Sequence, residues 1–76
     1  MHDPARALYS GVDGLDAMRA VSRTARRLLR EGGLLAVEHG DAQGAEVRAL
    51  FTSDGWRAAA THRDATGRDR VTTATR

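Results

Sequence analysis

Apolar residues between positions 13 and 31 recur at the three- and four-residue spacing of an α-helix. Asp13 precedes them as a candidate N-cap, and Asp16 adds a carboxylate to the positive first turn. Gly32 and Gly33 follow the last apolar position, where glycine commonly ends a helix in the left-handed conformation. The pattern therefore predicts a helix over residues 13–31. Its apolar positions are Leu15, Met18, Val21, Ala25, Leu28 and Leu29.

The next segment replaces helical spacing with a short unbroken apolar run. Residues 34–37 read LLAV, which is too short for a helix and predicts a strand over 33–38 that is buried on both faces, as in a parallel sheet. A second helix is predicted over 42–54, with Asp41 as its cap and Gly55 as its end. Its inward-facing residues are Val47, Leu50 and Phe51.

The last twenty residues carry the pattern of two strands joined by a turn. Segments 56–63 and 69–75 flank residues 65–68 (ATGR), whose glycine supports a turn, so they predict an antiparallel hairpin. Residues 1–12 contain the only proline and little periodicity, and we expect an irregular lead-in there. The whole chain, 1–76, is predicted to form a single partial domain.

The predicted order is helix, parallel strand, helix and antiparallel hairpin, which defines an α/β fold. The strand–helix–strand unit implies a crossover, and the hairpin adds an antiparallel strand to an otherwise parallel sheet. Complete nucleotide-binding sheets begin with a strand and a Gly-rich turn that lets backbone amides approach the ligand. Neither is expected in this sequence, so the pattern predicts the closing part of such a sheet.

Charge is nearly balanced, because twelve basic residues, all arginine, oppose ten acidic residues to give a net charge of +2. Four arginines fall on the predicted outer side of the first helix, where a solvated face is favoured over a nucleic-acid surface. They are Arg23, Arg26, Arg27 and Arg30. At 76 residues, the chain buries a modest fraction of its surface, so we expect a thin stability margin.

Several classes of site are disfavoured by residue content. The chain has no cysteine, and His2, His39 and His62 lack the spacing of metal ligands. The longest apolar run is far too short for a membrane span, and the first residues lack the basic-then-apolar pattern of a signal peptide. We therefore expect a cytoplasmic protein with no metal and no membrane partner.

Three separated stretches resemble the HemK-type protein-(glutamine-N5) methyltransferases, which modify peptide chain release factors. Residues 2–4 (HDP) and 7–16 (ALYSGVDGLD) are similar to the family's acid-proline pair and its A-L-x-G-G-x-D-G-L segment. Residues 32–40 (GGLLAVEHG) resemble its penultimate parallel strand. Residues 63–71 (RDATGRDRV) resemble its closing hairpin, with the pattern R-D-x-x-G-x-x-R-V. The sequence departs from the family at Asp3, where glutamate is usual, and at Ser10, where glycine is usual.

The resemblance implies the carboxyl-terminal part of a Rossmann-like class I methyltransferase. The complete family enzyme transfers a methyl group from S-adenosylmethionine to a glutamine side chain of a release factor. By the resemblance, its Gly-rich cofactor loop, its ribose-binding acid and its Asn-Pro-Pro-Tyr motif all precede residue 1. We therefore expect this chain alone to be inactive, to bind no cofactor and to contain no catalytic residue.

Five polar residues are candidates for the edge of the completed site. By the resemblance, Asp3, Tyr9 and Asp13 lie on its substrate-side rim, although a loop acid, a packed aromatic and a helix cap are the favoured interpretations. Glu38 and His39 follow the predicted parallel strand at its carboxyl end, where open α/β sheets place ligands. A structural role is favoured for this pair too.

Two alternatives belong to other functional classes. In the complete family sheet the strand at 34–37 has an upstream neighbour, so its outer edge is expected to be unpaired here and to invite pairing. The chain would then be a small interaction module that forms a homodimer or docks onto a complementary N-terminal half. The second alternative, arginine-mediated binding of RNA or DNA, has only the basic composition in its favour.

Overall fold

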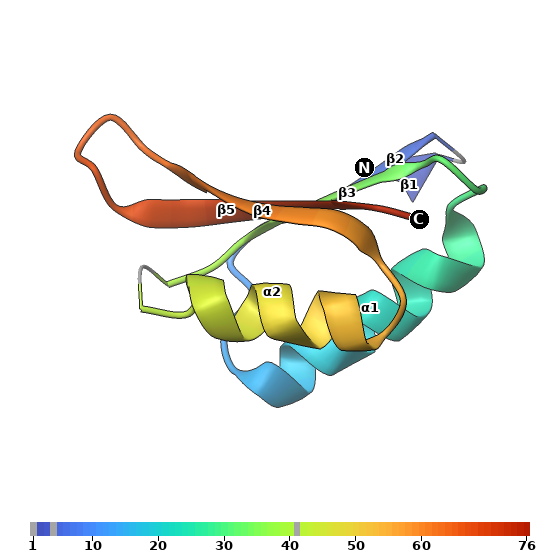
Figure 1. The fold of residues 1–76 in the computed structure, drawn as a ribbon, viewed down its shortest axis with the longest axis horizontal. Helices are drawn as coiled ribbons and strands as arrows, with labels where there is room; N and C mark the ends of the chain where they lie inside the picture. The colour runs from blue at the N-terminus through green and yellow to red at the C-terminus, as the bar shows by residue number, and fades with distance from the viewer. Residues whose placement is uncertain (1, 4, 41) are drawn as a thin grey trace.

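The computed structural model describes residues 2–3, 5–40 and 42–76, which form one five-stranded sheet with two helices on the same face (Figure 1). The order of elements alternates between strands and helices before the chain ends in a hairpin. The strands are β1 (His2–Asp3), β2 (Arg6–Tyr9), β3 (Leu34–Glu38), β4 (Arg57–Arg63) and β5 (Asp69–Thr75), and the helices are α1 (Leu15–Leu28) and α2 (Gly44–Ser53).

The sheet is mixed, with the spatial order β1-β2-β3-β5-β4. Only β2 and β3 pair in parallel, and the antiparallel pairs are β1–β2, β3–β5 and β4–β5. Because α1 connects two adjacent parallel strands, β2–α1–β3 is a complete strand–helix–strand unit. The fold class agrees with the prediction of helix, parallel strand, helix and antiparallel hairpin.

Alternate residues of three strands bury their side chains under the helices. On β3, Leu35 and Val37 are fully buried, and their neighbours on β5 are Thr72 and Ala74. This period-two burial is expected for a sheet covered on one face. The buried apolar residues are Ala7, Met18, Ala25, Leu29, Leu35, Val37, Val47, Phe51, Trp56 and Ala74.

Helix α2 ends in a left-handed turn at Gly55, whose φ is 93°. The Trp56 amide donates to the Phe51 carbonyl at 3.0 Å, and the Gly55 amide donates to the Thr52 carbonyl at 3.1 Å. The rings of Phe51 and Trp56 lie 6.1 Å apart, which adds the hydrophobic contact typical of this helix ending. Gly55 therefore ends α2 as predicted and delivers Trp56 into the core.

A chain of hydrogen bonds, which begins in the core and ends at the exposed Asp54, joins α1 to the end of α2. The indole Nε1 of Trp56 donates to the Ser22 hydroxyl at 2.9 Å, and that hydroxyl donates to Asp54 Oδ2 at 2.6 Å. The guanidinium of Arg26 lies 5.7 Å from the Trp56 ring centroid. Ser22 is therefore a polar side chain with both its donor and an acceptor position in use, although it lies fully inside the core.

The prediction of an irregular lead-in over residues 1–12 is wrong, because β1 and β2 lie within it. The sequence of β2, RALY, has one charged residue followed by Ala, Leu and Tyr, and it is only four residues long. Its pairing with β3 also overturns the expectation that the outer edge of the 34–37 strand is unpaired. A parallel neighbour, whose ladder runs from Arg6↔Leu34 to Tyr9↔Val37, occupies that edge.

The first helix is shorter than its predicted range of 13–31. Its N-cap is Gly14, with no side-chain cap hydrogen bond, so the predicted capping role of Asp13 is wrong. At the other end Leu29 is already extended, with φ −85° and ψ 139°, and is buried in the core. Burial of Leu29 ends the helix before the glycines, and Gly32 instead takes its left-handed φ of 83° in the following turn.

Two other predicted details differ from the structure. The strand at 33–38 was expected to be buried on both faces, but Leu34 is 44% exposed and Glu38 is exposed, because α1 and α2 both lie on the opposite face of the sheet (Figure 1). The second helix begins at Gly44 with Gln43 as its N-cap. Asp41, its predicted cap, lies outside the described residues.

We expect Ser22→Ala to lower the free energy of unfolding by about 1–3 kcal/mol, because it leaves the buried Trp56 Nε1 without its acceptor. Urea denaturation followed by tryptophan fluorescence measures this change at the only tryptophan. Ser53→Ala, at an exposed serine of α2, is the matched control. Equal stability of the two variants would show that the hydrogen-bonded junction is not a major contributor.

Candidate functional site

The described residues form an open hollow of about 360 Å³ at the carboxyl ends of β2 and β3. Two backbone hydrogen bonds assemble it: the Val12 amide donates to the Glu38 carbonyl at 3.1 Å, and the His39 amide donates to the Arg70 carbonyl at 2.9 Å. Open α/β sheets place ligands at this end of their parallel strands. The hollow is lined by Gly11, Val12, Asp13, Glu38, His39, Gly40 and Arg70.

Asp13 and Glu38 both line the hollow, and both residues are exposed. Asp13 comes from the loop between β2 and α1, whereas Glu38 is the last residue of β3. Parallel pairing of β2 and β3 makes their carboxyl ends neighbours, so the two carboxylates share one rim. The rim can accept hydrogen bonds from a polar group, since ionised carboxylates are acceptors only.

The other two rim candidates lie elsewhere. Tyr9 is half-buried and packs against the core, and it is not among the residues that line the hollow. Asp3 is in the edge strand β1, where its backbone pairs with Arg6, and its side chain lies outside the described part of the chain. The structure thus brings Asp13 and Glu38 together without adding Tyr9.

The ring of His39 is directed into the protein, and only 5% of this residue is exposed. Its Nδ1 lies 2.8 Å from the Gly40 carbonyl, and its Nε2 lies 2.7 Å from the Thr72 hydroxyl. A carbonyl oxygen only accepts, so Nδ1 carries the proton that it donates to Gly40, and in the neutral ring Nε2 accepts from Thr72. His39 therefore holds the Gly40 loop in place while its ring nitrogens are occupied.

The hydrogen-bond chain continues beyond Thr72 across the hairpin. The hydroxyls of Thr72 and Thr61 lie 2.9 Å apart, and Thr61 also accepts from the guanidinium of Arg48 on α2. Gly44 makes room for this approach, since a Cβ there would lie 3.0 Å from Thr61 Cγ2 and 3.3 Å from Arg48 Nη1. One polar chain thus fixes α2, the hairpin and the β3 end relative to one another.

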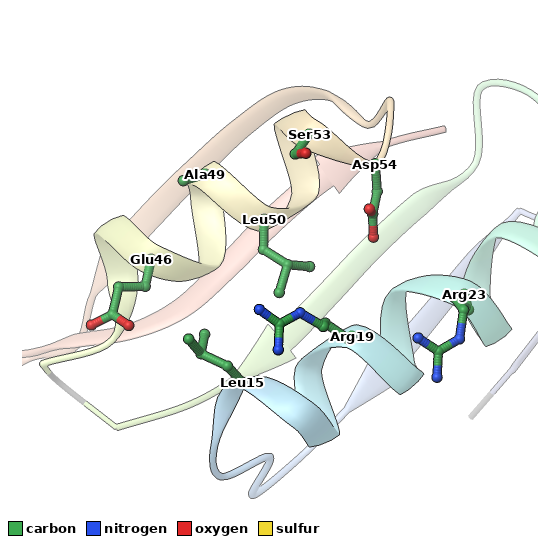
Figure 2. A pocket seen from close by; sticks show the side chains of 8 residues that line it. All are labelled: Leu15, Arg19, Arg23, Glu46, Ala49, Leu50, Ser53 and Asp54. Carbon is green, nitrogen blue, oxygen red and sulfur yellow. The ribbon is translucent and has the colours of Figure 1, made fainter.

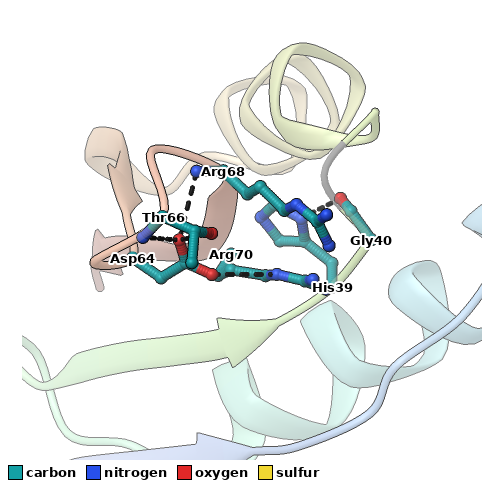
Figure 3. A network of polar contacts seen from close by, with 6 residues as sticks. All are labelled: His39, Gly40, Asp64, Thr66, Arg68 and Arg70. Atoms are coloured by element: carbon teal, nitrogen blue, oxygen red, sulfur yellow. Dashed lines mark hydrogen bonds and ion pairs between the residues drawn. The ribbon is translucent and has the colours of Figure 1, made fainter.

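The hairpin turn is built around the carboxylate of Asp64 (Figure 3). Its Oδ1 accepts from the Thr66 hydroxyl at 2.6 Å and from the amides of Thr66 and Arg68 at 2.8 and 3.1 Å. Its Oδ2 accepts from Arg70 Nε at 3.2 Å, which connects the turn to a residue that lines the hollow. Donation by the Thr66 hydroxyl, reinforced by the other donors, lowers the pKa of Asp64 from 3.8 to about 2.

Sequence reasoning did not select Arg70 or Asp64 as site residues. Both lie in the stretch R-D-x-x-G-x-x-R-V, which served only as a sign of resemblance. Its spacing has a physical explanation. Asp64 closes the turn, Gly67 takes a left-handed φ of 83°, and the side chain of Arg70 donates a hydrogen bond back to Asp64. Thr72, the partner of His39, had no such signal, because threonine is common in strands and β5 contains three threonines.

A second open hollow, of about 490 Å³, lies between α1 and α2 (Figure 2). Leu15 and Leu50 form apolar parts of its lining, and the Arg19 guanidinium extends beside them. Arg19 is paired with the exposed Asp16 at 3.2 Å. The full lining is Leu15, Arg19, Arg23, Glu46, Ala49, Leu50, Ser53 and Asp54. Its opposite charges come from facing helices, which is the expected pattern of a solvated helix–helix groove.

Within the described ranges, no three side chains of histidine, aspartate or glutamate are grouped in a way that could hold a metal ion. Neither α1 nor α2 is long and apolar enough to cross a membrane.

No family model matches the chain, but many known proteins resemble it, and three of them are informative. It is 54% identical over 74 residues to the release factor glutamine methyltransferase of Streptomyces coelicolor, covering 96% of this chain and 26% of that protein. It is also 54% identical over 54 residues to a 4-amino-L-phenylalanine/4-methylamino-L-phenylalanine methyltransferase of Streptomyces pristinaespiralis, covering 71% of this chain and 18% of that protein. A crystal structure of a release factor-specific protein-(glutamine-N5) methyltransferase from Alicyclobacillus acidocaldarius superposes with a TM-score of 0.64 and 31% identity, over 83% of this chain and 40% of that one.

The mixed sheet and the hollow at its parallel strand ends therefore define a part of a Rossmann-like methyltransferase fold. The chain spans about a quarter of the length of the Streptomyces coelicolor relative. It belongs to the release factor glutamine methyltransferase family, as the carboxyl-terminal part of that fold.

We expect Asp64→Asn to destabilise the chain at neutral pH and to make its stability less sensitive to acid. Because the folded pKa of Asp64 lies below its ordinary value of 3.8, its contribution is fully present above that value and is lost as pH falls toward about 2. Urea denaturation of both proteins across this range should show their difference shrinking with falling pH. Asp16→Asn is the control, and a difference between wild type and Asp64→Asn that is constant with pH would contradict the assignment.

Burial raises the pKa of Tyr9 above 10.0, and the chain has no other tyrosine. The ultraviolet difference spectrum of the phenolate should therefore titrate at higher pH in the native chain than in the urea-unfolded chain. Its contribution to stability is fully present below the unfolded pKa and is lost as pH rises through the folded one. Coincident native and unfolded titrations would show that Tyr9 is not held in the core.

Proposed function

We propose that this chain is the carboxyl-terminal part of an S-adenosylmethionine-dependent methyltransferase that modifies a glutamine side chain of peptide chain release factors. The observation that carries the proposal is 54% identity to an enzyme of that name over 96% of the chain. Because the chain spans 26% of that relative, the activity belongs to the complete enzyme. Termination of translation is cytoplasmic, so the proposal includes that compartment.

In this proposal the chain supplies the substrate-side rim. Asp13 and Glu38 are among the residues that line the hollow, and a glutamine side-chain amide offers two N–H groups that can donate hydrogen bonds to carboxylates. Such contacts orient the amide nitrogen relative to the methyl donor, and correct orientation is a large part of the rate enhancement in group transfer. Arg70, held by Asp64, keeps the hairpin side of the rim in position.

The hollow does not fit S-adenosylmethionine by itself. It is open, and among the described residues of its lining Val12 is the one large apolar side chain, whereas cofactor sites enclose most of the ligand between apolar walls. No methyl-transfer step is therefore derived from these residues alone. The proposal assigns the cofactor site to a complementary N-terminal part of the enzyme and predicts that this chain alone is inactive.

A second acceptor class has one observation in its favour. The relative from Streptomyces pristinaespiralis carries the name of an arylamine methyltransferase and has the same 54% identity over its matched residues. An aromatic amine also presents N–H donors, so the same two carboxylates could orient it. The match covers 71% of the chain, against 96% for the release factor enzyme, and this difference favours glutamine as the acceptor.

A chimera tests the proposal: this chain replaces the matching quarter of the Streptomyces coelicolor enzyme. We expect the chimera to transfer labelled methyl groups from S-adenosylmethionine to a release factor, whereas the chain alone shows neither transfer nor calorimetric binding of the cofactor. Asp13→Asn in the chimera should lower kcat/KM by about tenfold or more, because the rim loses a charged acceptor.

Asp16→Asn is the matched control, since Asp16 is an exposed acid three residues away that does not line the hollow. If a folded chimera binds S-adenosylmethionine but methylates only the aromatic amine, the acceptor is the amine and not glutamine. Methylation of neither acceptor would refute the proposal, as would saturable micromolar binding of the cofactor to this chain alone.

A further inference from the structure

The hydrogen bonds behind the hollow run in one direction, because both ends of the series are chemically fixed. At one end the guanidinium of Arg48 can only donate, and its Nη1 lies 2.5 Å from the Thr61 hydroxyl. At the other end the Gly40 carbonyl can only accept, and it lies 2.8 Å from Nδ1 of His39 (Figure 3). The direction of every bond between these ends follows from the ends themselves.

Two hydroxyls and one imidazole ring lie between the two ends. With a proton on Nδ1, the neutral ring of His39 accepts at Nε2 from the Thr72 hydroxyl, 2.7 Å away. The Thr72 oxygen then accepts from the Thr61 hydroxyl at 2.9 Å, and Thr61 accepts from Arg48. Each of the three middle groups donates once and accepts once, so the series is self-consistent. We call these residues the relay: Arg48, Thr61, Thr72, His39 and Gly40.

The middle of the relay is shielded from water. Thr72 is fully buried and His39 is buried, whereas Thr61 is half-buried. Deletion of the Thr72 hydroxyl would therefore leave Nε2 of His39 without a donor in a place that water does not readily reach. At Thr61, in contrast, water can replace a lost partner. The bond between Thr72 and His39 is thus the most sensitive link of the relay.

The relay ends at the backbone that joins the two loops of the rim. Gly40 lies two residues after Glu38, whose carbonyl accepts from the Val12 amide at 3.1 Å, immediately before Asp13. The side of Gly40 that faces α2 is held too, since its amide donates to Gln43 Oε1 at 3.0 Å and its carbonyl accepts from the Gln43 amide at 3.1 Å. A displacement at Gly40 is therefore passed to the backbone of both acidic residues.

We propose that Thr72 and His39 are positioning residues for methyl transfer, and that the charge of Arg48 fixes the direction of the relay to which they belong. The inference rests on the proposed function, because the rim of Asp13 and Glu38 is what the relay holds. Both ring nitrogens of His39 are occupied, so its role is to hold the loop and not to remove a proton from the acceptor.

Nuclear magnetic resonance of the isolated chain tests the relay itself. In the neutral ring, isotope-labelled His39 should carry its proton on Nδ1 and none on Nε2. Thr72→Val should shift this ring signal and speed solvent exchange of the Val12 amide about tenfold or more, because the loop opens more often. Arg48→Met should act in the same direction but less strongly, since water can reach Thr61. Thr73→Val is the matched control, because the Thr73 hydroxyl contacts the exposed His62 instead.

The chimera tests what the relay does for the reaction. Thr72→Val in the chimera should lower kcat about tenfold or more, because a small misplacement of an orienting group is costly in rate. The KM for S-adenosylmethionine should stay unchanged, since the proposal assigns the cofactor to the other part of the enzyme. Thr72→Ser keeps the hydroxyl and should restore most of kcat, and Thr73→Val should leave kcat as it is.

Circular dichroism establishes that each variant is folded before it is compared. If Thr72→Val does not fold, Thr61→Val, which removes the next hydroxyl at a half-buried position, is measured in the same way. It should lower kcat, again without changing the KM for the cofactor.

A proton on Nε2 of the neutral His39 ring and none on Nδ1 would overturn the direction of the relay. An unchanged kcat in folded Thr72→Val would overturn the positioning role, and so would a loss of kcat that Thr72→Ser does not restore. A loss of cofactor binding in step with kcat would show a general structural defect and refute the proposal too. If the parent chimera transfers no methyl group to a release factor, the proposed function fails, while the ring signal and the amide exchange still decide whether the relay holds the rim.

Discussion

The parallel pairing of β2 with β3 is the interaction on which the rest of the structure depends. Four residue pairs, from Arg6↔Leu34 to Tyr9↔Val37, convert β3 from an edge strand into a central one. Parallel strands are normally covered by crossover helices, and here α1 provides that crossover between the two strands. Without this ladder, the buried residues of β3 would pack against the helices from a strand with an unpaired edge, which is a much weaker arrangement.

The same pairing also creates the candidate site. It places the loop after β2 beside the loop after β3, so Asp13 and Glu38 line the same hollow although 25 positions separate them in the sequence. The polar chain through His39, Thr72 and Thr61 then fixes the second loop against the hairpin. The geometry of the rim therefore depends on buried hydrogen bonds behind it, and the two carboxylates themselves remain exposed.

Much of this fold could be predicted from local patterns, and the failures share one physical cause. Gly55 ended a helix as predicted because its left-handed φ is a local requirement, and the turn around Gly67 follows from the same rule. The strand RALY was missed because its identity as a strand comes from β3, a partner more than twenty residues away. Asp13 was misassigned for a related reason: it satisfies the local rule for a cap, but the loop directs it to the rim.

The relatives of this chain differ in the molecule that accepts the methyl group, and the open hollow does not explain that difference. Two relatives with the same 54% identity carry names with chemically different acceptors, a protein glutamine and an aromatic amino acid. Both acceptors present an N–H group, and an ionised carboxylate accepts a hydrogen bond from such a group without distinguishing its parent molecule. Discrimination requires an enclosing pocket that leaves the wrong acceptor with unpaired groups, and the hollow described here is open. Under the proposed function, the rim would contribute to orienting the acceptor nitrogen, and selection between the two acceptors would require an enclosing pocket that the open hollow does not supply.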